Sequence, residues 1–134
     1  MEKIATYFRE KDRFAKFIGV ELTEVKPGYA RAKLKIDERH LNSANLVHGG
    51  AIYTLADFVF AVACNSYGFL SLGINTNVNF IRAAKDGTIY AEGKELAVNP
   101  KLGVYSIRIT DDNGELLATF EGLAYKKKDA LKLE

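Results

Sequence analysis

The stretch that decides the fold is residues 48–64, which read HGGAIYTLADFVFAVAC. Between Ala51 and Cys64 the polar exceptions are Thr54 and Asp57, and nearly every other residue is apolar. A helix that is apolar on all sides is normally buried inside its protein. The stretch therefore predicts one long buried helix that follows a His-Gly-Gly turn and ends at Gly68, a residue suited to a C-cap.

Short helices and a hairpin are expected before this helix. Apolar residues between Ile4 and Ile18 recur at helical spacing and predict one broken helix or two short amphipathic ones. The turn Lys26-Pro27-Gly28-Tyr29 joins two alternating stretches, which predicts a β-hairpin that ends near Ile36. Residues 37–47 are polar and aperiodic, which indicates a loop.

Alternating stretches after the helix predict an antiparallel sheet. They cover residues 72–83, 88–98, 102–110 and 116–125, and short turns separate them. Short turns favour antiparallel neighbours, because parallel strands need longer crossovers. The predicted fold class is therefore α+β, with a curved, mostly antiparallel sheet wrapped around one buried helix.

Length and composition indicate one ordinary globular domain, spanning residues 1–134. The net charge of +2 gives no reason to expect nucleic acid, and the run Lys126-Lys127-Lys128 is interpreted as a solvated tail. The chain starts without a signal-peptide pattern and has no apolar stretch long enough to span a bilayer. A cytoplasmic protein without membrane attachment is expected.

Metal and disulfide chemistry are not expected. Cys64 is the only cysteine, and His40 and His48 are the only histidines, so there is no disulfide framework and no multi-histidine site. Among apolar neighbours, Cys64 is expected to be a small core residue. The sequence also lacks a nucleophile-elbow serine and a glycine-rich phosphate loop. No metal and no separate cofactor are therefore predicted.

Asp57 is the residue most suggestive of chemistry, because it lies in the middle of the most apolar segment. A buried carboxylate without a partner is costly, so such a group is paired, neutralised or functional. Desolvation would raise its pKa toward the range that suits a general base. The alternative is a structural carboxylate that caps a loop or pairs with a buried arginine.

The turn His48-Gly49-Gly50 is the second candidate, because backbone N–H groups at the positive end of a helix can hold an oxyanion. The alternative is a plain loop-to-helix turn with His48 as its cap. Nine residues separate His48 from Asp57, which on a helix is roughly 13 Å and the opposite face. If both act on one substrate, they must come from two chains, and a two-fold dimer would build the site twice.

Polar residues on either side of the helix could assist. Asn42 and Asn45 could orient a water molecule or a thioester carbonyl, although asparagines also simply form turns. In the strand after the helix, one face is expected to carry Leu72, Ile74, Thr76, Val78 and Phe80. The opposite face would carry Asn75, Asn77 and Asn79, which could line a cleft or a subunit interface or simply face water.

The pattern Asn42-x5-His48-Gly49-Gly50-x6-Asp57 resembles the signature of hotdog-fold thioesterases of the phenylacetate-degradation (PaaI) type. The similarity continues to Ala63-Cys64-Asn65, and the strand order agrees over nearly the whole chain. The resemblance implies the hotdog fold, in which the sheet wraps the central helix. It also implies hydrolysis of acyl-CoA thioesters, often aryl or phenylacetyl, by a homotetramer built from homodimers, with coenzyme A as part of the substrate.

Carried over residue by residue, the resemblance assigns four catalytic residues. Asp57 would be the general base or the nucleophile, and the Gly49 N–H would polarise the thioester carbonyl. Asn42 would help to hold the attacking water or the carbonyl, and His48 would support the turn and the thioester.

The residues that bind the substrate are predicted less directly. They are Gly50, Asn75, Thr76, Asn77 and Arg82. Some relatives have a hydroxyl residue on the strand after the helix, but the loop expected over residues 68–73 leaves the strand register open. Arg82, Lys85 and Lys101 are candidates for contacts with the CoA phosphates.

Two other functions are compatible with the same fold. A non-catalytic acyl-CoA-binding protein would keep the cleft and release no thiol. A hotdog hydratase is disfavoured, because its catalytic His and Asp are arranged in a way that the spacing of His48 and Asp57 does not suit. The acyl group itself is not predicted, although Tyr53, Phe58, Phe60 and Tyr67 could shape an aromatic pocket.

Overall fold

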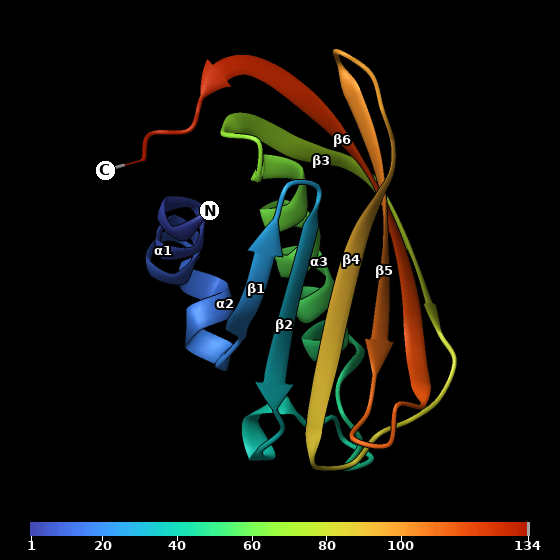
Figure 1. Ribbon diagram of the computed structural model, residues 1–134. Coiled ribbons are helices and arrows are strands. Elements are labelled where there is room, and N and C mark those ends of the chain that lie inside the picture. Colours follow the sequence, from blue (N-terminus) through green and yellow to red (C-terminus); the bar gives the residue numbers. More distant parts are fainter. Residues whose placement is uncertain (134) are drawn as a thin grey trace.

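In the computed structural model, which describes residues 1–133, a six-stranded antiparallel sheet curves around one long helix (Figure 1). The elements in chain order are α1 (Glu2–Lys11), α2 (Arg13–Ile18), β1 (Glu21–Lys26), β2 (Tyr29–Lys35), the 3-10 turn η1 (Glu38–His40), α3 (Gly49–Asn65), β3 (Phe69–Phe80), β4 (Thr88–Val98), β5 (Leu102–Thr110) and β6 (Leu116–Ala130). The strand order is β1-β2-β4-β5-β6-β3. The predicted α+β class and hotdog arrangement are confirmed.

The central helix α3 begins at Gly49 and is almost entirely buried, as its apolar sequence predicted. His48 is its N-cap, and the Nδ1 atom of His48 accepts a hydrogen bond of 2.8 Å from the Gly50 N–H. The helix ends at Asn65 with Ser66 as C-cap, so the expectation that Gly68 caps it was wrong. Gly68 instead adopts a φ of 90° in the turn that leads into β3.

The helix lies very close to the sheet, because glycines stand where it approaches. A Cβ atom at Gly73 of β3 would lie 2.8 Å from the Phe60 ring, and one at Gly122 of β6 would lie 2.7 Å from it. A Cβ atom at Gly93 of β4 would lie 2.6 Å from the side chain of Val59. Phe60 and Val59 of α3 therefore pack directly against the backbone of the sheet at these glycines.

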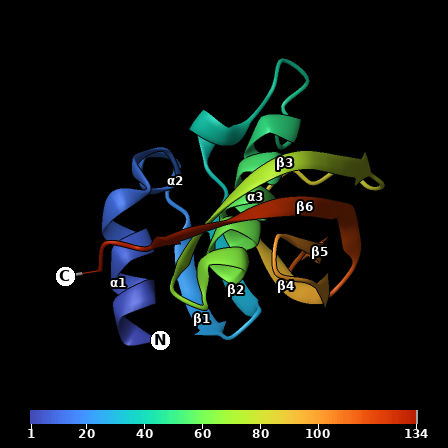
Figure 2. The ribbon, with the colours of Figure 1, turned by 90° about the horizontal axis from the view of Figure 1, so that it is seen from above.

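The two short N-terminal helices, α1 and α2, lie beside α3, on the side that the sheet leaves open (Figure 2). Ile4, Ala5, Phe8 and Ala15 are buried, and the Asp12 side chain caps α2 by accepting from the Ala15 N–H at 3.1 Å. The prediction of two short amphipathic helices is confirmed. None of the helices within residues 1–133 is long and apolar enough to cross a lipid bilayer.

Strand β3 differs from its expected form. It begins at Phe69, so no loop covers residues 68–73, and its pairing with β6 shifts register between Gly73 and Asn75. Because side chains alternate along a strand, this bulge reverses the faces on its two sides. Thr76, Val78 and Phe80 face α3 as predicted, but Leu72 belongs to the outer face.

Strand β6 is longer than expected and runs to Ala130. Lys126, Lys127 and Lys128 are therefore strand residues and not a solvated tail, and the Lys126 N–H donates to the Lys101 carbonyl at 2.7 Å. The loop of residues 37–47 is also better ordered than its polarity suggested, because Leu41 and Val47 form a β-bridge.

Candidate functional site

One stripe of α3 is left uncovered by the sheet and by the N-terminal helices. It consists of Gly50, Thr54, Asp57 and Ala61, which are exposed or half-buried and follow one another at helical spacing. Asp57 is therefore exposed in the single chain, which corrects the expectation that the helix buries it. The Asp57 carboxylate has no hydrogen-bond or ion-pair partner among residues 1–133, which argues against a structural pairing.

Asp57 lies in a hollow of about 460 Å³ between α3 and β3, which we call the Asp57 hollow. Its walls are Tyr53, Phe60, Ala61 and Cys64 of α3 and residues 71–76 of β3. The surrounding protein removes water from the carboxylate and raises the pKa of Asp57 above its ordinary value, and the negative charge of Asp12 raises it further. Such a carboxylate is a better proton acceptor than an exposed one at the same ionisation.

The single cysteine is a less suitable nucleophile. Cys64 is buried, and burial raises the pKa of its thiol to about 12. The thiolate is the reactive form of cysteine, so this side chain stays protonated near neutral pH. The prediction that Cys64 is a core residue is confirmed.

Thr76 of β3 carries a hydroxyl that contacts a side chain of α3. The Tyr53 hydroxyl and Thr76 Oγ1 are 2.8 Å apart, and both side chains line the Asp57 hollow. Asn75 also lines this hollow. Asn77 lies on the outer face of the sheet, in a separate hollow with Asn79 and Glu121.

The His48-Gly49-Gly50 turn lines a different hollow, of about 310 Å³, which we call the His48 hollow. Its lining residues are Phe14, Ile18, Arg39, His40, Leu41, His48, Gly50, Ala51 and Thr54. The Gly50 N–H is occupied by His48, whereas the Gly49 N–H has no partner among the described residues. Within one chain, the turn and Asp57 thus line separate hollows. Gly50 and Asp57 nevertheless lie on the same stripe of α3, so the expected opposite faces are not found.

The other predicted residues have local partners. Asn42 Oδ1 accepts from the backbone N–H groups of Ala44 at 2.9 Å and Leu46 at 3.1 Å, so this oxygen shapes the loop before His48. Arg82 is exposed and pairs with Glu115 at 3.3 Å. His40 is buried, accepts from the Asp37 N–H and donates to the Ile18 carbonyl at 2.6 Å, which makes it a structural residue.

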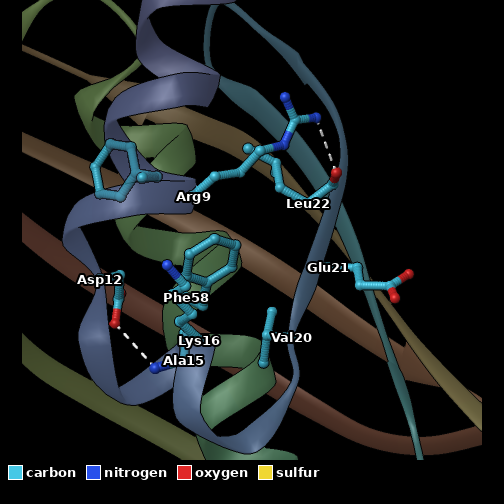
Figure 3. A pocket seen from close by; sticks show the side chains of 9 residues that line it. Arg9, Asp12, Ala15, Lys16, Val20, Glu21, Leu22 and Phe58 are labelled. Carbon is cyan, nitrogen blue, oxygen red and sulfur yellow. Dashed lines mark hydrogen bonds between the residues drawn. The ribbon is translucent and has the colours of Figure 1, made fainter.

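A third hollow, of about 210 Å³, lies between α1, α2 and β1 (Figure 3). Phe58 of α3 forms part of its wall, and Arg9 donates to the Leu22 carbonyl at 3.0 Å across it. Asp12, which acts on the pKa of Asp57, also lines it. This influence could not be predicted from the sequence, because Asp12 and Asp57 are far apart in the chain.

Comparisons with known proteins agree with this architecture. The sequence profile of the Thioesterase superfamily matches residues 44–118, more than half of the chain. The chain belongs to this superfamily. It is a thioester hydrolase with the hotdog fold, and it is of the PaaI type.

Several relatives of this thioesterase cover most of its length. A putative esterase of Archaeoglobus fulgidus is 33% identical over 94% of this chain and 82% of its own length. The acyl-coenzyme A thioesterase PaaI of Escherichia coli K12 is 30% identical over 87% of this chain and 84% of its own. The solved structure of the E. coli PaaI protein, from the phenylacetic acid degradation operon, superimposes with a TM-score of 0.91 at 27% identity and covers 96% of both chains.

Proposed function

We propose that this thioesterase hydrolyses acyl-CoA, and that each active site combines Asp57 of one subunit with the Gly49 N–H of its partner in a two-fold dimer. The observation that carries the proposal is an unpaired carboxylate of raised pKa on the one uncovered stripe of α3, with an unused N–H at the start of the same helix. Eight residues separate the two groups, roughly 12 Å along the helix, so one chain cannot bring them to one carbonyl.

A two-fold axis solves this problem if the two α3 helices run antiparallel. When Asp57 faces Gly49 of the partner subunit, the axis passes midway between these positions, at Tyr53. The Tyr53 side chain forms a hydrogen bond with Thr76, and Thr76 lies near the middle of the edge strand β3. The same axis would therefore place the two β3 strands side by side, and one dimer would serve both the helices and the sheets.

The chemistry needs few groups. The Gly49 N–H of the partner subunit donates to the thioester carbonyl, while Asp57 takes a proton from a water molecule whose oxygen attacks the carbonyl carbon. The tetrahedral intermediate then expels the CoA sulfur, which leaves as a thiol after receiving the proton from Asp57. In a second route Asp57 attacks the carbonyl directly, and water hydrolyses the resulting anhydride.

The substrate proposal follows the relatives. The PaaI name and operon make phenylacetyl-CoA the first acyl-CoA to test, beside short and medium alkyl acyl-CoAs. Asn42 stays a prediction as the residue that holds the water or the carbonyl. The residues that stay predictions as substrate contacts are Gly50, Asn75, Thr76, Asn77 and Arg82. A dimer of dimers stays a prediction too, and the molar mass in solution measures it.

The shared site can be tested by mixing two inactive variants. Asp57→Asn removes the base, and Gly49→Pro removes the N–H at a first helical position, where proline is well tolerated. The extended backbone of His48 suits a residue before proline. Gly49→Ala is the matched control, because it adds a Cβ beside Phe80 and keeps the N–H.

We expect each variant alone to lose about 100-fold or more in kcat, the scale of a lost oxyanion donor. Gly49→Ala should keep most of the activity. A heterodimer of Asp57→Asn with Gly49→Pro contains one intact site, and thiol release should recover toward half of the wild-type value. If the isolated heterodimer stays inactive, the two groups do not act across subunits.

A further inference from the structure

We propose that Phe14 of α2 forms a wall of the acyl-binding pocket. It would contact the acyl group of the substrate on which Asp57 of the partner subunit acts. This inference rests on the proposed function, because it places the acyl group beside the thioester carbonyl at Gly49. It adds a specificity residue that lies outside the Asn-His-Gly-Gly-Asp pattern. The observations concern the packing of α2, the lining of the His48 hollow and the position of this hollow at the start of α3.

The first observation is that α2 exposes two phenylalanines although the helix is firmly held. Phe14 is 62% exposed and Phe17 is 73% exposed, while Ala15 between them is buried beside Phe58 (Figure 3). Arg39 and His40 donate to the carbonyls of Phe17 and Ile18 at 2.7 and 2.6 Å. The exposure is therefore built into a fixed helix, and large exposed aromatic groups commonly mark binding surfaces.

The second observation separates the two phenylalanines. Phe14 lines the His48 hollow, and Phe17 does not. Ile18, Leu41 and Ala51 line the same hollow, so much of its wall is apolar. Its volume of about 310 Å³ is at the lower end of the range for small-molecule pockets, roughly 300–1,000 Å³.

The third observation is the position of this hollow relative to the chemistry. His48, Gly50 and Thr54 line it, so it lies at the start of α3, where Gly49 stands between two of its lining residues in the chain. An acyl group whose carbonyl is held by that N–H would extend along the apolar wall. In the antiparallel dimer the start of α3 faces Asp57 of the partner subunit, and Phe14 and that carboxylate would contact one substrate from two chains.

The test compares Phe14→Ala with Phe17→Ala, the same substitution three residues apart on the same helix. For phenylacetyl-CoA and hexanoyl-CoA we expect kcat/KM of Phe14→Ala to fall about tenfold, the scale of a lost apolar contact. Acetyl-CoA, which is too short to reach Phe14, should change less than twofold. Phe17→Ala should keep the wild-type values with all three substrates.

Purified heterodimers decide whether Phe14 acts across subunits. A wild-type chain joined to a chain with both Asp57→Asn and Phe14→Ala should show the selectivity of Phe14→Ala, because its one active Asp57 faces the altered Phe14. A Phe14→Ala chain joined to an Asp57→Asn chain should show wild-type selectivity. The reverse pattern would show that Phe14 and the catalytic Asp57 of one active site come from the same chain.

The inference is overturned if Phe14→Ala and Phe17→Ala give the same kcat/KM values for the three substrates. It is also overturned if Phe14→Ala lowers kcat/KM equally for all three. Unchanged thermal stability of Phe14→Ala would show that the helix is intact. The proposed function fails by a different result, namely when the wild-type protein releases no thiol from any acyl-CoA or when Asp57→Asn keeps its rate. An active wild-type enzyme with unaltered selectivity in Phe14→Ala would remove this inference alone.

Discussion

The two edges of the sheet, β1 and β3, are built in opposite ways. Strand β1 has six residues with a bulge between Leu22 and Glu24, carries charged side chains, and is partly covered by α1, whose Arg9 donates to the Leu22 carbonyl. Strand β3 has twelve residues, none of them charged, and exposes Phe69, Leu72, Ile74 and Phe80 by about half. Proteins protect free edges with charges, bulges and short length. β1 has all three, whereas β3 is bulged but long and uncharged, which supports β3 as the interface.

The largest expected effect comes from placing a charge on the unprotected edge. Ile74→Lys would bring two like charges together near the proposed two-fold axis, and like charges that face each other across strands are destabilising. We expect a monomer with at least 100-fold lower thiol release, measured by light scattering and kinetics. Thr23→Lys on β1 is the control and should change neither mass nor rate. An Ile74→Lys protein that stays oligomeric would refute the interface, and a monomeric, fully active one would refute the shared site.

A smaller effect should separate the two faces of β3. Thr76→Val removes a hydroxyl that lines the Asp57 hollow and contacts the Tyr53 hydroxyl, and we expect kcat to fall about tenfold, the scale of one lost hydrogen bond. Asn79→Ala changes a residue on the outer face of the same strand and should stay within twofold of the wild type. Equal losses in the two variants would contradict the assignment of Thr76 to the site. Thermal stability is the control for both.

The smallest expected effect is a shift of the pH profile through Asp12. The Asp57 carboxylate must be ionised to accept a proton, so activity is lost as the pH falls through its pKa. Asp12 raises that pKa by its negative charge, and Asp12→Asn should therefore move the acid limb of kcat/KM to lower pH. Asparagine is also a good N-cap, so α2 should keep its start. An acid limb that stays in place would show that the loss of water around Asp57 sets its pKa without help from Asp12.

Much of the fold could be predicted from the sequence, because its signals are local. The apolar run after His48 predicted α3, and the turns at Gly28 and at Asp111–Gly114 predicted the hairpins. The errors arose where the pairing of strands overrides the alternation of apolar and polar residues in the sequence. The bulge after Gly73 moved Leu72 to the outer face, and pairing with β3 and the Lys101 carbonyl extended β6 through the lysines that resemble a tail.

The candidate site was predictable only in part. Helix geometry alone separated Asp57 from the His48-Gly49 turn, and the structure places them in separate hollows. The exposure of Asp57 could not be predicted, because it depends on which side of α3 the N-terminal helices leave uncovered. The roles proposed for Phe14 and Asp12 depend on how α2 packs, and no pattern in residues 12–18 indicates it.

The contact of Phe60 with Gly73 and Gly122 constrains how this chain can change over evolutionary time. Alanine at either glycine would collide with the ring, so neither position can mutate alone while residue 60 stays aromatic. A smaller residue at position 60 would relieve both glycines at once but leave a void against the sheet. We therefore expect these three positions to co-vary among homologues. If the three positions change together, the distance between α3 and the sheet is kept. The position of Asp57 on α3 relative to the Asp57 hollow is then kept as well.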